Sequence, residues 1–314
     1  MESFLFALGA VAPLFGVMVV GYALSLTEFF SDTMLSDFNR FVFNIALPCL
    51  LFRQSYQTDF STGNGLRLPL FCVAFALVLV AFLWVLVPRF ATDSRRASAI
   101  IQGVYRTNIA LFGLPLAINL FGEQNAGDMV LIIALLVPLF NVIAVVLLSS
   151  FSDSAQKPSF KAIASEVLKN KLIWSVIIGL TVAGSHINVP DILLKPVFEL
   201  GATATPLAML SLGGQFSFKS AASNRKALAA SCFLRLAAVP AVATVTAIVF
   251  GFTGVALATV FIVFGAPTAS SSYIMAKTMG ADGELAGEIV VFTTMMSVVT
   301  VLIGTTAFRF FGVI

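Results

Sequence analysis

The sequence contains little charge, and this scarcity excludes a water-soluble fold. Charged residues make up 11% of the 314 residues, whereas hydrophobic residues make up 59%. A soluble domain ordinarily carries about 25% charged residues. So few charges cannot cover a surface that faces water. We therefore expect an integral membrane protein whose surroundings are the lipid bilayer.

Other scarce features exclude further classes. The net charge is only +3 and Lys/Arg runs are short, which argues against nucleic-acid binding. Cys49, Cys72 and Cys232 lie in apolar runs without metal-ligand spacing, so we interpret them as packing residues and expect neither a metal nor a cofactor. The first apolar run has no basic residue before it and no small-residue cleavage site after it. It is therefore interpreted as a first span and not as a cleaved signal peptide.

Ten apolar segments approach the length of about 20 residues that a membrane-spanning helix needs. The uncharged stretch Leu236–Ala276 is too long for one helix, and Gly251–Gly254 marks a turn that divides it. The sequence therefore predicts an all-α integral membrane protein with ten transmembrane helices. The expected spans are Ser3–Thr27, Phe38–Tyr56, Leu68–Val87, Ala97–Phe121, Met129–Phe151, Leu172–Ile187, Leu200–Phe218, Ala227–Phe250, Val255–Lys277 and Ile289–Phe308.

The longest polar stretch, residues 152–171, divides the chain into five-span halves, residues 1–151 and 172–314. Lys and Arg are concentrated in the odd-numbered loops, which indicates that these loops are cytoplasmic. Both termini would then lie outside the cell, or in the periplasm, with the chain in the cytoplasmic (inner) membrane. An odd number of spans inverts the second half relative to the first, which is a design of secondary transporters.

Two polar stretches, Tyr105–Pro115 and Phe264–Tyr273, interrupt the apolar spans 4 and 9. At 1.5 Å per residue, Asn108 lies about 16 Å from one end of span 4 and Pro267 about 18 Å from one end of span 9. The hydrocarbon core is about 30 Å thick, so both stretches are expected near its middle, reached from opposite faces. Paired interruptions of this kind are the best indication of a transporter binding site.

The chemistry of these stretches favours an anion. Gly113, Pro115, Gly265 and Pro267 are the expected helix breaks, and half-helices that begin at a break present positive ends. No Asp or Glu lies in the middle of a predicted span to neutralise them. The expected substrate-binding residues are Arg106, Thr107, Asn108, Thr268, Ser270 and Ser271.

Structural interpretations of the same residues stay open. Pro115 and Pro267 could be simple kinks, the serines could be small packing residues, and Asn108 could make an interhelical hydrogen bond. Arg106 could pair with backbone carbonyls or with Glu288. Arg235 is expected to lie shallower in span 8 and to extend towards the cytoplasm.

At these two stretches the sequence resembles the auxin efflux carrier family, which includes plant PIN carriers and bacterial permeases for malonate and malate. Arg106–Asn108 followed by Gly113–Leu116 is similar to the family's span-4 signature, although Thr107 stands where the plant carriers have a proline. Gly265–Ala269 is similar to the span-9 signature. Ala204–Ala208 in span 7 and Thr294–Thr300 in span 10 also fit, so the resemblance covers essentially the whole chain.

The resemblance implies two inverted five-helix repeats, NhaA-like or bile-acid-transporter-like, with broken helices 4 and 9 crossing near the substrate. Spans 1, 2, 6 and 7 would form a scaffold, and spans 3–5 and 8–10 a transport unit. A homodimer through the scaffold is also implied. By the same match, Asn108, Pro115 and Pro267 correspond to crossover or substrate-site positions.

We therefore expect a secondary carrier for small organic anions, such as malonate, malate or auxin-like acids, that works by alternating access. An anion that leaves an inside-negative cell gains about 2.3 kcal/mol per charge per 100 mV. This gain favours export by about fifty-fold without a coupling ion. The alternatives are a channel, a sodium-coupled carrier of bile-acid-transporter type, or a sodium- or proton-coupled importer that would use Glu199 or Glu288 near span ends.

An enzyme is disfavoured by the residues that the spans lack. An intramembrane aspartyl protease needs two buried acids, and none is expected in the middle of a span. A serine hydrolase would need a base near Ser270–Ser272, and the single histidine, His186, is expected at the end of span 6.

Overall fold

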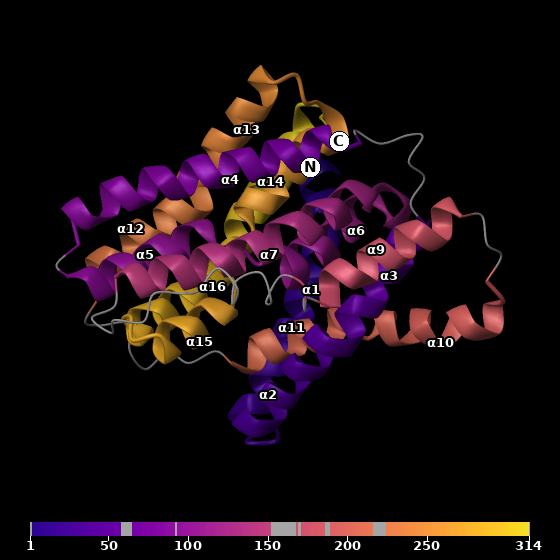
Figure 1. Ribbon diagram of the computed structural model, residues 1–314, viewed down its shortest axis with the longest axis horizontal. Helices are drawn as coiled ribbons and strands as arrows, with labels where there is room; N and C mark the ends of the chain where they lie inside the picture. The colour runs from indigo at the N-terminus through magenta and orange to yellow at the C-terminus, as the bar shows by residue number, and fades with distance from the viewer. Residues whose placement is uncertain are drawn as a thin grey trace. The chain divides into compact units, whose positions relative to one another are not determined.

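A computed structural model describes residues 2–57, 65–91, 93–151, 168, 171–185, 189–215 and 224–313. Most of the expected linker 152–171, and His186, lie outside these ranges. Among the described residues all regular elements are helical, which confirms the all-α prediction. The α-helices (Figure 1) are α1 (Glu2–Leu26), α2 (Asp32–Phe41), α3 (Leu47–Gln57), α4 (Arg67–Leu86), α5 (Ser94–Tyr105), α6 (Leu114–Phe121), α7 (Gly127–Ser150), α9 (Lys171–Gly184), α10 (Asp191–Ala202), α11 (Ala204–Gly214), α12 (Arg225–Phe233), α13 (Val239–Val249), α14 (Gly254–Gly265), α15 (Ser271–Thr278) and α16 (Gly283–Phe310).

Short turns of other helix types continue several of these helices. The 3₁₀ turns are η2 (Val87–Arg89) and η4 (Glu123–Asn125), and the π-helical turns are η1 (Val42–Ala46), η3 (Ile109–Gly113) and η5 (Leu234–Ala238).

Six helical segments of the described chain are long and apolar enough to cross a membrane. They are Thr33–Gln57, Arg67–Arg89, Gly127–Ser150, Asp191–Gly214, Arg225–Val249 and Gly283–Phe310. A seventh candidate is the N-terminal helix, which consists of Ser3–Gly9 and Ala12–Leu26 bent by 43°. The apolar helices Ile109–Phe121, Lys171–Gly184 and Gly254–Gly265 are shorter. Each expected span thus coincides with a helix or with an interrupted helix, although only some are long enough to cross unaided.

Three helices begin earlier than hydropathy alone predicts. The α2 helix begins at Asp32, where the side chain of Ser31 accepts the Met34 N–H at 3.1 Å. The α16 helix begins at Gly283, where the Asp282 carboxylate accepts the Leu285 N–H at 3.0 Å. The α10 helix occupies most of the expected loop between spans 6 and 7. Hydropathy locates the apolar part of a helix, whereas capping side chains mark where α2 and α16 start. The α10 helix begins after Pro190 without a side-chain cap.

Each π-helical turn is followed two residues later by a proline: Pro48 after η1, Pro115 after η3 and Pro240 after η5. Proline has no backbone N–H and its ring clashes with the carbonyl four residues earlier. A wider π turn relieves both problems without ending the helix. The helical path therefore continues through Gly113 and Pro115 to Phe121, and the interruption of span 4 lies before them.

The described chain forms two compact units. The first comprises Met1–Pro69, Ala110–Leu135 and Asn170–Phe216. In it, α1 and α11 pack at backbone distance, because a Cβ at Gly21 would overlap the Leu210 carbonyl and a Cβ at Gly213 would overlap the Met18 carbonyl. Gly213 lies in the last turn of α11 and permits this close approach.

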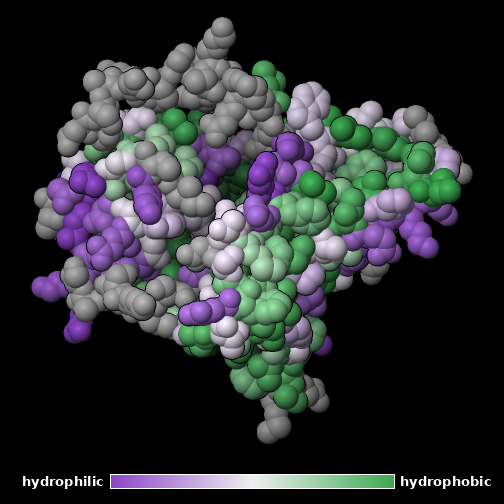
Figure 2. Space-filling model, turned by 90° about the horizontal axis from the view of Figure 1, so that it is seen from below, coloured by the Kyte–Doolittle hydropathy of each residue, from purple (hydrophilic) through white to green (hydrophobic). Residues whose placement is uncertain are grey.

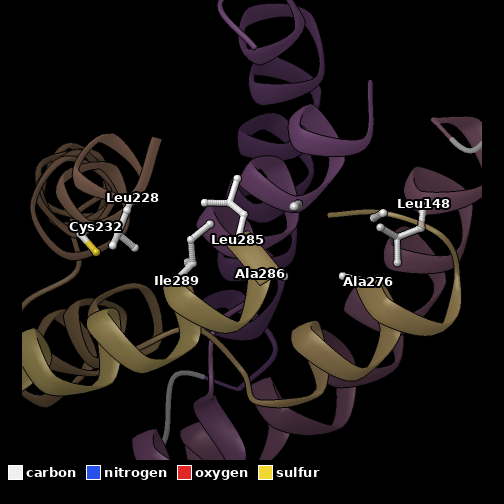
Figure 3. Packing of buried hydrophobic residues seen from close by; sticks show 9 residues of the cluster. Leu148, Leu228, Cys232, Ala276, Leu285, Ala286 and Ile289 are labelled. Carbon is white, nitrogen blue, oxygen red and sulfur yellow. The ribbon is translucent and has the colours of Figure 1, made fainter. Parts of the chain in front are cut away.

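The second unit comprises Leu70–Ile109, Leu136–Lys169 and Ser217–Ile314. A cluster of small and branched side chains joins α5, α7, α12, α15 and α16 in it. The cluster consists of Ala99, Leu148, Leu228, Cys232, Ala276, Ala281, Leu285, Ala286 and Ile289. Figure 3 shows Leu285 and Ile289 of α16 near Leu228 and Cys232 of α12, and Ala276 of α15 near Leu148 of α7. This packing holds the helices that flank the two interruptions.

Large hydrophobic side chains also lie on the surface, for example Val78 and Phe82 on α4 and Val245 and Val249 on α13. Hydrophobic residues cover broad areas of the face drawn in Figure 2, beside hydrophilic ones. Such extensive apolar exposure is unfavourable in water and suits contact with lipid tails.

Candidate functional site

Two interrupted helices of the second unit meet and bond to each other. The α5 helix ends at Tyr105 and is followed by extended backbone. The α14 helix ends at Gly265, and five residues separate it from α15, which begins at Ser271. Thr107 and Thr268 form an antiparallel bridge. On either side of it, the Asn108 N–H donates to the Pro267 carbonyl at 2.8 Å and the Ala269 N–H donates to the Arg106 carbonyl at 3.0 Å.

Side chains satisfy the carbonyls that the interruptions leave without helical partners. The Thr268 hydroxyl donates to the Gly103 carbonyl at 2.7 Å, and the Thr268 N–H donates to the Thr293 hydroxyl at 3.1 Å. Arg235 donates to the carbonyls of Val104 and Ala266. In an apolar environment every backbone polar group needs such a partner, so these bonds make the interruptions tolerable.

Arg106 is 4% exposed and lies among polar groups from three helices. Its Nη2 donates to Asn141 Oδ1 of α7 at 2.5 Å, and its Nη1 contacts the Met275 sulfur of α15 at 2.7 Å. The Gln102 amide fits best when its oxygen accepts from Arg106 Nη1 at 3.0 Å and its nitrogen donates to the Ser272 carbonyl at 3.3 Å. Arg106 is thus held in place at the first interruption.

Three buried polar atoms next to these groups have no hydrogen-bond partner among the described residues. They are Asn108 Nδ2, Ser270 Oγ and Ser272 Oγ. Leaving such a group buried and unpaired costs about 1–3 kcal/mol. All three can donate a hydrogen bond: Asn108 belongs to the first interruption, Ser270 to the second, and Ser272 to the first turn of α15. This combination is expected of a site that is completed by a ligand or by water.

The structure gives the expected site residues different surroundings. Arg106, Asn108 and Ser270 lie at the bonded interruptions. Thr107 and Thr268 are there too, but the Thr268 hydroxyl is used by the Gly103 carbonyl and the Thr107 hydroxyl lies 3.5 Å from the Ala266 carbonyl. Ser271 is the partly buried first residue of α15.

Of the four expected helix-break residues, two lie at an interruption and two lie within a continuous helical run. Gly265 ends α14, and Pro267 lies within the second interruption. Gly113 and Pro115 are buried in the helical run that follows the first interruption.

Sequence reasoning missed Gln102, Asn141 and Ser272, all of which contribute to this polar cluster. Asn141 is a polar side chain inside an otherwise apolar span, and Gln102 lies one helical turn before Arg106. Both features were signals that could have found them, because polar groups within membrane spans usually face a partner or a site.

The expectation for one of two charged residues was wrong. Arg235 does not extend towards the cytoplasm: its side chain is fully buried, because two helix ends offer it carbonyls. Glu288 was expected near the start of span 10; it is 4% exposed and lies in the second turn of α16, which begins at Gly283. In the described ranges, no group of three or more His, Cys, Asp or Glu side chains could hold a metal ion.

Apolar helices, two bonded interruptions and a buried cluster of hydrogen-bond donors define a membrane protein that handles a solute. A family model described as "Membrane transport protein" matches residues 6–304, and the chain belongs to that family. The resemblance to the auxin efflux carriers is thereby confirmed, and the protein is a multi-pass membrane transporter.

Two curated relatives match along almost their whole length. A protein of Rhizobium meliloti described as "Putative malonate transporter" is 23% identical over 298 residues, which are 93% of this chain and 93% of the relative. A protein of Methanothermobacter thermautotrophicus described as "Uncharacterized transporter" is 22% identical over 293 residues, which are 90% of this chain and 92% of the relative.

Proposed function

We propose that the protein is a secondary transporter that moves small organic anions, most of all carboxylates, by alternating access. The observation that carries this proposal is the set of unpaired donors Asn108 Nδ2, Ser270 Oγ and Ser272 Oγ at the two interruptions. A carboxylate accepts several hydrogen bonds at once, so it could satisfy all three groups.

The electrostatics of the interruptions support an anion over a cation or a neutral solute. The guanidinium of Arg106 lies in the same cluster and interacts with Gln102 and Asn141. The α15 helix begins directly after Ser270, and a helix N-terminus favours negative charge. Hydrogen bonds to a charged acceptor are about twice as strong as neutral ones. The description of the Rhizobium relative as a malonate transporter points to the same class of substrate.

The proposed transporter crosses the membrane ten times. The six long helices, the bent α1, the short α9 and the two interrupted helices would together make ten spans. The linker then separates residues 1–151 and 172–314 as inverted five-span repeats. Scaffold and transport spans, both termini outside the cytoplasm, the inner membrane and a homodimer remain part of the proposal.

The driving force that we propose is the membrane potential, with export of the anion. Glu288 supports a second candidate, a proton-coupled importer, because a buried carboxylate within a span can carry a proton across. The two candidates differ in direction and coupling, and both use the same anion site.

Counterflow in proteoliposomes tests the proposal. Vesicles loaded with unlabelled malonate, malate, lactate or indole-acetate should accumulate the labelled form of at least one of them. Asn108→Ala should remove this exchange, whereas Asn119→Ala should retain it, because Asn119 lies on α6 and outside the interruption. Failure to exchange any carboxylate, or normal exchange by Asn108→Ala, would contradict the proposal.

A further inference from the structure

Arg235 is a buried cation that the proposed substrate site does not use. It lies in η5, and its side chain has no exposed surface. Its Nη1 donates to the Val104 carbonyl at 2.9 Å, and its Nε and Nη2 donate to the Ala266 carbonyl at 2.9 and 2.5 Å. Val104 is in the last turn of α5 and Ala266 follows the last residue of α14. One guanidinium therefore bonds the C-terminal ends of both interrupted helices.

The positive charge of Arg235 balances the partial negative charges of the two helix ends. The C-terminal end of a helix carries a partial charge equivalent to about −0.5, from carbonyls without helical partners. Two such ends meet at Arg235, so a single positive charge balances them. Arginine remains protonated in proteins and its planar fork suits two acceptors at once. A buried charge of this kind is costly unless polar groups compensate it, and here all three guanidinium nitrogens donate to carbonyls.

In inverted-repeat carriers, carbonyls of unwound segments and the C-terminal ends of half-helices are the groups that coordinate sodium. Here the corresponding carbonyls of α5 and α14 already bond to a guanidinium that is covalently part of the chain. A mobile cation could bind these oxygens only by displacing the Arg235 side chain, which is covalently attached to its own helix.

We propose that Arg235 is a built-in cation that takes the place of a coupling ion at the paired interruptions. It positions the ends of α5 and α14 against each other permanently, and the protein therefore needs no sodium to assemble its site. The location of Arg235 in a π-helical turn is consistent with this role, since such turns are frequent at functional sites.

The proposal extends the proposed transport function but can be tested without any substrate. Thermal unfolding of the purified protein reports whether the helix ends need a cation. If Arg235 does not act in this way while carboxylate exchange persists, only the present proposal fails. If exchange fails while the cation response holds, only the proposed function fails.

The experiment compares the wild type, Arg235→Ala and Arg225→Ala. Arg225 is a matched control, because it lies exposed in the first turn of α12, the helix that η5 continues. Each protein is unfolded in choline chloride, in sodium chloride of equal ionic strength, and in choline chloride with added methylguanidinium. We expect the wild type and Arg225→Ala to show the same Tm in all three. Arg235→Ala should have a lower Tm, which methylguanidinium raises in a saturable way.

Two results would overturn the proposal: a sodium-specific rise in the Tm of the wild type, or no greater effect of methylguanidinium on Arg235→Ala than on Arg225→Ala. If Arg235→Ala does not fold, Arg235→Lys decides instead. The ammonium keeps the charge but not the fork, so a lowered Tm that sodium does not change supports the proposal. A sodium response of Arg235→Lys, or a Tm equal to that of the wild type, contradicts it.

Discussion

The two interruptions reach the same backbone pairing by different local chemistry. The second contains Pro267 and follows Gly265, so its own residues disfavour a continuous helix. The first, Arg106–Asn108, contains neither proline nor glycine. The helix before it, α5, ends where Thr268 bonds to the Gly103 carbonyl and Arg235 bonds to the Val104 carbonyl. One interruption is thus specified mainly by local sequence and the other mainly by tertiary partners.

Among the threonine, proline and Glu288 variants, the largest effect on stability should come from removing a tertiary partner. Thr268→Val deletes the hydroxyl that bonds to the Gly103 carbonyl and leaves that carbonyl unpaired and buried. We expect a loss of about 1–3 kcal/mol in the free energy of unfolding. The matched variant Thr107→Val should lose less, because the Thr107 hydroxyl lies 3.5 Å from its acceptor. Thermal or denaturant unfolding measures both, and equal losses would remove the distinction between the two threonines.

Substitution of Pro267 should lower carboxylate exchange much more than substitution of Pro115. Pro267→Ala restores an N–H and lets α14 extend, which would move the Pro267 carbonyl away from the Asn108 N–H. We expect carboxylate exchange to fall by at least about tenfold, equivalent to about 1.4 kcal/mol. Pro115→Ala should change exchange much less, because Pro115 lies in a helical run that continues on both sides of it. A larger loss from Pro115→Ala would show that η3 and its proline define the site.

The smallest effect should come from Glu288→Gln if transport is driven by the membrane potential. This change removes the ionisable carboxyl group of α16 and keeps the shape of the side chain. Export under an imposed potential should then stay within a factor of two of the wild type, on the order of 0.4 kcal/mol. Loss of transport together with loss of its response to a pH gradient would favour the proton-coupled alternative. The measurement is flux into vesicles with the two gradients imposed separately.

The contrast between the interruptions also explains what the sequence could predict. The positions of the apolar helices and of the second interruption follow from hydropathy and from Gly265 and Pro267. The first interruption was expected around Gly113 and Pro115, but π turns accommodate proline within a helix, and the partners of this interruption are distant in sequence. Those partners, Thr268 and Arg235, lie in other elements and reach the end of α5 only in the folded protein, so no local pattern predicts them.

The same reasoning applies to single residues of the site. Arg106 and Asn108 stand out because polar side chains are rare in an apolar span. The role of Arg235 depends on two carbonyls that become available only when both helices end nearby. Glu288 was expected just before span 10, which was predicted to begin at Ile289. The α16 helix begins six residues earlier, at Gly283, where the Asp282 carboxylate caps it.

Malonate binding to Asn108→Asp tests the central claim most directly. This substitution keeps the size of the side chain but replaces the unpaired Nδ2 donor with an acceptor that is negatively charged when ionised. Calorimetric titration should show saturable binding of malonate, or of the carboxylate that exchanges best, by the wild type and by the control Asn119→Asp. We expect no detectable binding by Asn108→Asp in its folded form. Unchanged affinity of that variant would contradict an anion site at the paired interruptions.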